Sequence, residues 1–384
     1  MNTVLDFSRE VAPADAGLSE SGVAGILAEF EGQWQRGLHP AAQLVVVRRG
    51  RVLLDRAVGR ADVRSGRPAT PGTPFCAFSF GKMFLGVAVH QLIEAGRIEL
   101  DAPVAEYWPE FGCKGKQTAT IRHAFTHRAG IPLRGLYRQV WGWPDWERTV
   151  ARVAALPAEW PPGTRMAYHL VNFGFILGEV ARRVTGLPVP QLLRERVFEP
   201  LGLRDTYLGV PQSELGRVAR LYSGHIGTLG AALQFDRPSV RRAVVPAGNL
   251  HTTARETATL LQMLLDDGEY AGQRLLRPET VAFATSLGAE GYDETQRGPR
   301  RWGHGFQLGG DFDLGGGQVV RWPMGRGSTP RTFGHFALGS SMSWADPASG
   351  LIVVHLTNRL LPSAANTARH LAISDAVWGA ANDE

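Results

Sequence analysis

The sequence predicts a mixed α/β (α+β) fold, in which an antiparallel sheet built from both ends of the chain is flanked by helices. Three observations predict it: β-rich runs lie near the start of the chain, similar runs return near its end, and amphipathic helical pieces separate them. With 384 residues and no obvious linker, the chain suits one large domain or two closely packed ones. We expect a sheet domain of residues 1–100 and 246–384 and an inserted, mainly helical domain of residues 101–245.

The first hundred residues predict a helix, a hairpin and a second helix. Residues 18–37 carry apolar positions at helical spacing after a serine-rich start, and the pattern ends at a glycine. Residues 41–62 contain two β-rich runs joined at Arg49 and Gly50, which predicts a hairpin. The run that follows "GTPFCAFSFGKM" is helical and nearly apolar on all sides, so this helix should be buried.

The rest of the chain changes from helical to strand-like patterns. Pro, Gly and Trp punctuate amphipathic pieces such as "FGFILGEVARRVTG" between about residues 101 and 245. The glycine-rich stretch "GGDFDLGGGQ" predicts a mobile hairpin or loop, because no helix follows it that could present backbone amides to a phosphate. A last helix is expected over about residues 363–379. Short runs with tight turns predict antiparallel strands within 302–310, 331–340, 341–349 and 350–360.

Composition limits the classes of function. The net charge is +5 with acidic and basic residues interspersed, and no basic helix carries interleaved aromatics, so nucleic acid is not an expected partner. No stretch approaches 18 uninterrupted apolar residues, and the first residues lack a basic start followed by an apolar run. Two cysteines, Cys76 and Cys113, give neither a disulfide framework nor a metal spacing. We expect a cytoplasmic protein without membrane contact.

Ser79 and Lys82 are the clearest candidates for chemistry. The chain has only three lysines among its 41 basic residues, and a lysine can lose its proton when desolvated, whereas an arginine cannot. At a spacing of three residues both side chains share one helix face, with the serine near the positive end of the helix. Ser-x-x-Lys also arises by chance, as a capping serine with an extended lysine, but a buried helix favours catalysis.

Five segments in order resemble the class C β-lactamase-like serine hydrolases, and the nearest branch is the family VIII carboxylesterases. The resemblance covers most of residues 20–375 and implies the serine β-lactamase fold. It also implies that Ser79 is the acylated nucleophile, that Lys82 is its general base or proton relay, and that Tyr168 is a second proton-transfer group at a turn before a helix. The segments are "TPFCAFSFGKMFLGVAVHQLIEAGRIELDAPVAEYWPEF", "ATIRHAFTHRAGIP", "PPGTRMAYHLVNFGFILGEVARRVTG", "VPAGNLHTTARETATLLQMLL" and "FGHFALGSSMSWADPASGLIVVHLTNR".

The same resemblance places a third motif at His335, Phe336 and Ala337, where related proteins have Lys-Thr-Gly or a relaxed version of it. His335 and Ala337 should face the substrate together, because side chains alternate along a strand. The backbone N–H groups of Ser79 and Leu338 would form the oxyanion hole. Ala337 adds a methyl group where the family usually has glycine, which narrows the site.

Two departures from the family favour esters over β-lactams. Leu170 stands where β-lactamases usually have an asparagine that can bind the substrate amide. The carboxylate-binding lysine of the third motif is replaced by His335.

Other candidate residues indicate a substrate-binding or metal-binding role less specifically. Tyr137, Trp141, Trp143 and Trp146 crowd a stretch broken by Gly and Pro, which suits either a loop beside an apolar pocket or core packing. His169 and His225 are further candidates near the substrate, although a core or surface histidine is the default for each. His123 and His127 have the spacing of a zinc helix, but the expected glutamate and a third ligand are missing, so we expect no metal.

These residues predict a serine carboxylesterase that cleaves short-chain or apolar esters through an acyl-enzyme on Ser79, without a cofactor. Its expected partner is a small-molecule ester, and a homo-oligomer is compatible with the sequence. The same residues would also suit a β-lactamase, a D-amino-acid peptidase or amidase, or an acyltransferase. A binding protein that kept the fold and lost turnover is the alternative from another class.

Overall fold

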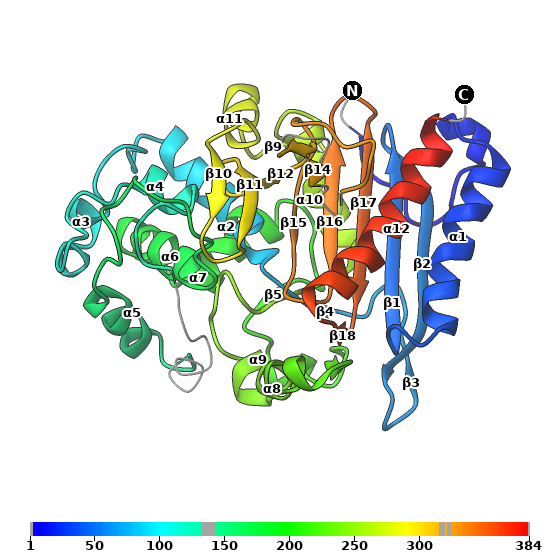
Figure 1. Ribbon diagram of the computed structural model, residues 1–384, viewed down its shortest axis with the longest axis horizontal. Coiled ribbons are helices and arrows are strands. Elements are labelled where there is room, and N and C mark those ends of the chain that lie inside the picture. Colours follow the sequence, from blue (N-terminus) through cyan, green and yellow to red (C-terminus); the bar gives the residue numbers. More distant parts are fainter. Residues whose placement is uncertain (1–2, 133–142, 315–318, 321–323, 383–384) are drawn as a thin grey trace.

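The computed structural model describes residues 3–132, 143–314, 319–320 and 324–382. Its main feature is a nine-stranded sheet in the order β10-β11-β12-β15-β16-β17-β1-β2-β3 (Figure 1). Strand β1 (Ala41–Arg48) pairs antiparallel with β17 (Leu351–Thr357), so the two ends of the chain meet in the middle of the sheet. The predicted fold class is confirmed.

Both faces of the sheet are covered, which explains why β1 is buried along its whole length. Leu44 and Val46 pack into one core cluster, which includes residues of helices α1 (Glu20–Gln35) and α12 (Ser363–Asn382). Val45 and Val47 alternate into the other cluster, which includes α2 (Gly81–Glu94) and α10 (Ala254–Leu265). Figure 1 shows α1 and α12 side by side over β1, β2 and β17.

The predicted hairpin is present. Strand β2 (Arg51–Asp62) follows β1 after a two-residue turn in which Arg49 has φ 50° and Gly50 has φ 75°. Positive φ at both positions is the geometry whose twist matches that of the paired strands. At the glycine-rich segment, β13 (Phe312–Asp313) pairs antiparallel with β14 (Val319–Val320).

The remaining elements agree with the predicted change from helices to strands, although several strands were not predicted, among them β10 and β11. The helices of the middle region are α3 (Val104–Tyr107), α4 (Ile121–Phe125), α5 (Trp146–Ala155), α6 (Asn172–Thr185), α7 (Val189–Leu193), α8 (Ile226–Phe235) and α9 (Pro238–Arg241), and α11 (Pro278–Ala284) follows later. The other strands are β3 (Arg67–Pro68), β4 (Phe75–Phe78), β5 (Tyr207–Leu208), β6 (Tyr222–Ser223), β7 (Leu250–Thr252), β8 (Glu269–Tyr270), β9 (Gln273–Arg274), β10 (Ala289–Asp293), β11 (Gly298–Trp302), β12 (Gln307–Leu308), β15 (Phe333–Phe336), β16 (Met342–Asp346) and β18 (Arg359–Leu360).

The division into two domains stays a prediction. Strand β5, from the inserted region, pairs with β7, which in turn pairs with β4. This small sheet ties the inserted region to the segments on either side of it.

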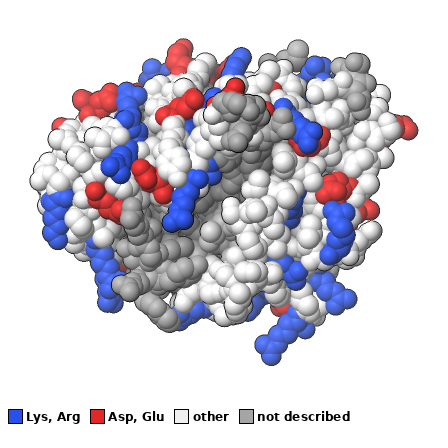
Figure 2. Space-filling view, viewed as in Figure 1, with Lys and Arg blue, Asp and Glu red and all other residues white. Residues whose placement is uncertain are grey.

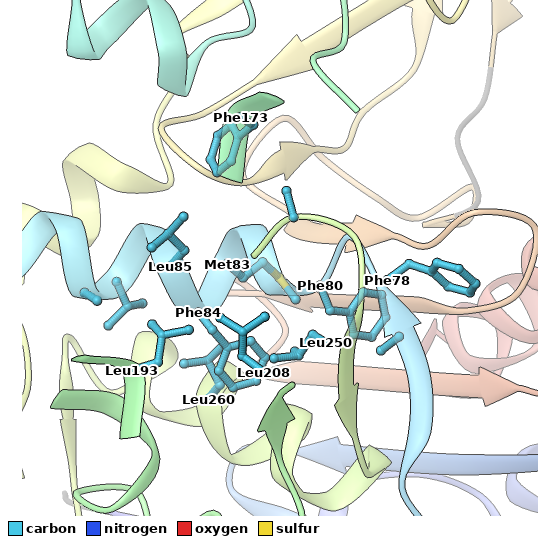
Figure 3. Packing of buried hydrophobic residues seen from close by; sticks show 14 of the residues in the cluster. Phe78, Phe80, Met83, Phe84, Leu85, Phe173, Leu193, Leu208, Leu250 and Leu260 are labelled. Atoms are coloured by element: carbon cyan, nitrogen blue, oxygen red, sulfur yellow. The ribbon is translucent and has the colours of Figure 1, made fainter. Parts of the chain in front are cut away.

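Helix α2 is buried as predicted, and its start is held close to a neighbouring backbone. Figure 3 shows Phe80, Met83 and Phe84 packed among Leu208, Leu250 and other apolar side chains. A Cβ atom on Gly81 would lie 2.1 Å from the Pro246 carbonyl oxygen, and one on Gly174 of α6 would lie 2.5 Å from the Ala247 nitrogen. The two glycines therefore let α2 and α6 approach the backbone at residues 246–247.

The surface agrees with the expectation drawn from charge. On the face shown in Figure 2, basic and acidic side chains are interspersed among the described residues, without a continuous basic stripe. No helix within the described ranges is both long and apolar enough to cross a membrane.

Three buried histidines form a cluster on the face of the sheet that is covered by α1 and α12, away from α2. His39, His355 of β17 and His370 of α12 are almost fully buried, and the Nδ1 atoms of His355 and His370 lie 3.1 Å apart. Burial lowers the pKa of His39 to about 3 and holds the pKa values of His355 and His370 well below their ordinary value. The folded protein therefore keeps all three rings neutral at mildly acidic pH.

We predict that the free energy of unfolding falls as the pH drops below about 6.5. Below this pH the unfolded chain binds protons that the buried histidines of the folded protein do not bind. This difference lowers the free energy of unfolding by up to about 1.4 kcal/mol per pH unit for each histidine. Urea unfolding between pH 7.5 and 5 measures the slope. His370→Asn should reduce that slope by about one proton. An equal slope in His370→Asn and wild type would contradict the prediction.

Candidate active site

Ser79 lies in the turn between β4 and α2, directly before the first residues of the helix. Phe78 has φ 46°, an unusual value for a bulky residue that is typical of strained turns at functional sites. This turn brings the Ser79 side chain to the N-terminal end of the 14-residue helix, where its dipole favours negative charge.

Lys82 is fully buried in the first turn of α2. Its Nζ lies 2.7 Å from the Leu170 carbonyl oxygen, 3.2 Å from the Ala247 carbonyl oxygen and 3.3 Å from the Ser79 Oγ. Within the described part of the chain, no carboxylate forms an ion pair with it. Desolvation therefore holds the pKa of Lys82 well below its ordinary value, which favours the neutral amine.

Tyr168 lies in the turn before α6 and forms a hydrogen-bonded group with Ser79 and Lys82. Its Oη is 2.8 Å from the Ser79 Oγ and 2.8 Å from the Lys82 Nζ. Its ring stacks on Trp302 of β11 with centroids 5.3 Å apart, and its backbone N–H donates to Asp293 Oδ1 at 3.1 Å. Burial raises the pKa of Tyr168, so the phenol stays protonated.

These distances define a direction for proton transfer. A neutral Lys82 amine has two N–H donors, which the carbonyl groups of Leu170 and Ala247 can accept, and one lone pair. The lone pair can accept the Tyr168 hydroxyl, which can accept the Ser79 hydroxyl in turn. A proton can thus move from the serine to the lysine through the tyrosine.

A cavity of about 520 Å³ opens beside this group, a size typical of sites for small molecules. Several predicted site residues line it, namely Ser79, Tyr168, Leu170, His335, Phe336, Ala337 and Leu338. Its other walls come from α8, from the start of α12 and from the segment that contains β11. The cavity therefore lies between the helical region and the sheet.

Strand β15 presents the third motif along one wall. The His335 ring is 6.1 Å from the Tyr168 ring and is buried, and Ala337 is also buried. Burial, with a smaller effect of Lys82, lowers the pKa of His335 to about 3, so its imidazole is neutral. Phe336 alternates to the other face of the strand and packs partly against the cluster of α1 and α12. His335 therefore does not supply the positive charge of the lysine it replaces.

Ser79 and Leu338 both line the cavity, and their backbone N–H groups are the predicted oxyanion hole. Neither donates a hydrogen bond to another residue in the described ranges. Unused donors beside a serine nucleophile are what an oxyanion hole requires.

Other predicted residues lie away from the cavity. His169 is fully buried, and its Nε2 accepts a hydrogen bond from the Ile131 backbone N–H. Trp143 is also buried and packs against Phe235, with ring centroids 5.4 Å apart. Neither residue is among those that line the cavity, and the expectation that they bind substrate stays a prediction. Tyr137 and Trp141 lie outside the described residues.

The histidines considered for a metal have structural contacts. His123 closes a capping box with Thr120 at the start of α4, and His127 Nδ1 accepts from the His169 backbone N–H. Across the described ranges, no cluster of three His, Cys, Asp or Glu side chains is arranged to hold a metal ion. His225 caps α8 and is exposed.

Sequence reasoning missed the residues that position the group. Asp293 is fully buried, and its Oδ1 accepts the backbone N–H groups of Tyr168, Thr295 and Gln296. Trp302 supports the Tyr168 ring. Both come from the hairpin of β10 and β11, and no motif in the sequence indicates that hairpin.

Comparisons with known proteins agree with this geometry. The family model described as Beta-lactamase matches residues 27–377. The chain belongs to the β-lactamase family. This β-lactamase-family chain is 31% identical over 349 residues to "Esterase/beta-lactamase LipL" of Mycobacterium tuberculosis, which covers 83% of this chain and 77% of the relative. It is 29% identical over 380 residues to "Esterase EstB" of Burkholderia gladioli, with 88% and 90% covered.

Solved structures agree as well. The crystal structure of a family VIII carboxylesterase matches this β-lactamase-family chain with a TM-score of 0.80 and 27% identity, over 95% of this chain and 99% of that one. The predicted resemblance to the family is confirmed, and the chain is a serine hydrolase of the β-lactamase family.

Proposed function

We propose that the protein is a carboxylesterase that cleaves short-chain or apolar esters through an acyl-enzyme on Ser79. The observation that carries the proposal is the hydrogen-bonded group of Ser79, Tyr168 and a buried, unpaired Lys82 at the wall of a small-molecule cavity. Relatives named as esterases support the choice of substrate class.

In the acylation step, the Ser79 Oγ attacks the ester carbonyl carbon. The serine proton passes to the Tyr168 oxygen while the tyrosine proton passes to the Lys82 nitrogen. The N–H groups of Ser79 and Leu338 stabilise the oxyanion, where one such donor is typically worth about two to three orders of magnitude in rate. The C–O bond to the alcohol then breaks, and the alcohol leaves with a proton returned through Tyr168.

In the deacylation step, water attacks the acyl carbon and gives its proton to the same relay. The bond to Ser79 breaks, a carboxylic acid is released and the serine regains its proton. The neutral amine and the neutral phenol are restored together, so one proton path serves both halves of the reaction.

A fluorophosphonate probe tests the proposal. We expect one adduct in the mass of the intact protein, located by peptide mapping on the peptide that contains Ser79, together with hydrolysis of p-nitrophenyl butyrate. A protein that neither forms the adduct nor hydrolyses the ester would be a binding protein with a hydrolase fold.

We predict that esters are preferred over β-lactams. The side chain of Leu170 offers no hydrogen bond to a lactam amide, and the neutral His335 offers no cation to its carboxylate. The kcat/KM for nitrocefin should therefore lie far below that for p-nitrophenyl butyrate. Leu170→Asn keeps the backbone carbonyl that accepts Lys82 and should raise the lactam-to-ester ratio about tenfold. Leu361→Asn, on another wall of the cavity, is the matched control, and equal ratios in both variants would contradict the prediction.

We also predict that Ala337 limits the size of the acyl group. Its methyl group lines the cavity two residues after His335, so Ala337→Gly should raise kcat/KM for a pivalate ester more than for an acetate ester, by about tenfold. Ala231→Gly removes a methyl group from α8, on a different wall, and should leave the ratio unchanged. A pivalate-to-acetate ratio that Ala337→Gly does not alter would place residue 337 away from the acyl group.

A further inference from the structure

The cavity wall carries a side-chain amide whose hydrogen-bonding groups are unused. Three amide side chains line the cavity, those of Gln296, Gln307 and Asn366. The Gln296 oxygen accepts the Arg300 Nε, and the Asn366 oxygen accepts the Arg369 Nη2. In the described part of the chain, by contrast, neither the oxygen nor the nitrogen of the Gln307 amide has a hydrogen-bond partner.

The position of Gln307 in the sheet leaves its side chain to face the cavity. Gln307 begins β12, where it pairs with Trp302, whose ring stacks on Tyr168, and with Gly334, the residue before His335. The backbone of Gln307 is therefore part of the sheet, on both sides of the strand. The residue is only 3% exposed, yet its amide atoms are not among the buried side-chain atoms that lack both a partner and contact with solvent. The amide is therefore reached through the cavity that Gln307 lines.

An unpaired amide in a largely desolvated place selects the group that binds beside it. An apolar group would cover the amide and leave its donors and its acceptor unpaired, which weakens binding. A carbonyl group only accepts hydrogen bonds, so it would satisfy the nitrogen and leave the oxygen unpaired. A hydroxyl group can donate to the Gln307 Oε1, and a second hydroxyl beside it can accept from the Nε2. Hydroxyl groups therefore complement this amide better than the other neutral groups.

We infer that the Gln307 amide binds a free hydroxyl group of the substrate, so that the preferred esters carry at least one hydroxyl away from the ester bond. The inference rests on the proposed esterase function and refines it. A polar group placed in the wall of a mainly apolar cavity fixes the orientation of a small ligand and provides specificity. The hydroxyl can belong to the alcohol part, as in a monoester of a polyol, or to the acyl part, as in an ester of a hydroxy acid.

Two pairs of esters distinguish these sources, with release of the acid followed by titration at constant pH. The first pair compares 2,3-dihydroxypropyl butyrate with propyl butyrate, which share the acyl part. The second compares methyl 6-hydroxyhexanoate with methyl heptanoate, in which a methyl group replaces the hydroxyl. In the wild type, the hydroxylated ester of at least one pair should have the higher kcat/KM by about tenfold, mainly through a lower KM.

Gln307→Met keeps the length of the side chain but removes both hydrogen-bonding groups. It should lower kcat/KM for the hydroxylated ester about tenfold and leave its partner without the hydroxyl within about twofold, so that the preference disappears. Gln307→Asn keeps the amide but shortens its reach by one CH₂ group, and it should fall between wild type and Gln307→Met. Gln262→Met is the matched control, because Gln262 of α10 is also 3% exposed but does not line the cavity, and this variant should keep the wild-type preference.

Separate outcomes identify separate failures. A wild type that hydrolyses both esters of each pair equally well would overturn the role of Gln307 and leave the esterase proposal standing. A preference for the hydroxylated ester that survives in Gln307→Met would overturn it as well, because another group would then hold the hydroxyl. A wild type that hydrolyses no ester of either pair would overturn both proposals. If Gln307→Met fails to fold, the comparison of wild type with Gln307→Asn decides the question.

Discussion

Replacing Ser79 by alanine is expected to abolish ester hydrolysis and fluorophosphonate labelling together. In the proposed mechanism this change removes the atom that forms the acyl bond, so kcat should fall by about four orders of magnitude or more. The hydrogen bond of 2.8 Å between the Tyr168 Oη and the Lys82 Nζ does not involve Ser79 and can remain. The change removes only one oxygen atom from the wall of the cavity. The thermal unfolding midpoint should therefore stay close to that of the wild type.

Ser363→Ala is the matched control for this experiment. Ser363 also lines the cavity, at the start of α12, but its hydroxyl makes no hydrogen bond with Lys82 or Tyr168. This variant should keep its labelling and most of its activity. A Ser79→Ala protein that is folded and still turns over p-nitrophenyl butyrate at the wild-type rate would rule out the acyl-enzyme on Ser79.

The parts of the site that could be predicted are local in sequence or belong to recognisable segments. Ser79 and Lys82 are one helical turn apart, so a buried helix is enough to bring them together. Tyr168 lies 86 residues from Lys82, and only the resemblance to a known family placed it beside them. The hairpin of β1 and β2 was likewise readable from two β-rich runs joined at Arg49 and Gly50.

The parts that could not be predicted depend on tertiary register. Arg300 and Trp302 reach the site because β11 pairs with β12 at Trp302 and Gln307, and nothing in their local pattern indicates that pairing. His169 follows Tyr168 directly, yet the turn sends its ring into the core, where it accepts the Ile131 N–H. A residue next to Tyr168 in the sequence therefore need not lie near the cavity when the chain turns at that point.

Replacing Lys82 by arginine should be nearly as damaging as replacing it by alanine. Burial without a carboxylate partner favours the neutral amine, and an arginine in the same place keeps its proton and cannot accept that of Tyr168. Both variants should lose about two to four orders of magnitude in kcat, the usual cost of removing a general base. In the wild type, Lys82 must lose its proton before it can act. A plot of kcat/KM against pH should therefore rise and reach its plateau well below the ordinary pKa of a lysine.

Lys116→Arg is the matched control for this charge-conserving change. Lys116 is also buried, and its Nζ also contacts backbone carbonyl groups, those of Cys113 and Leu156, but it does not line the cavity. A similar loss of kcat in this variant would mean that arginine at a buried lysine position harms the protein in general. Retention of more than about a tenth of wild-type kcat in Lys82→Arg would show that only the positive charge matters, and the relay from Ser79 through Tyr168 to Lys82 would then be wrong.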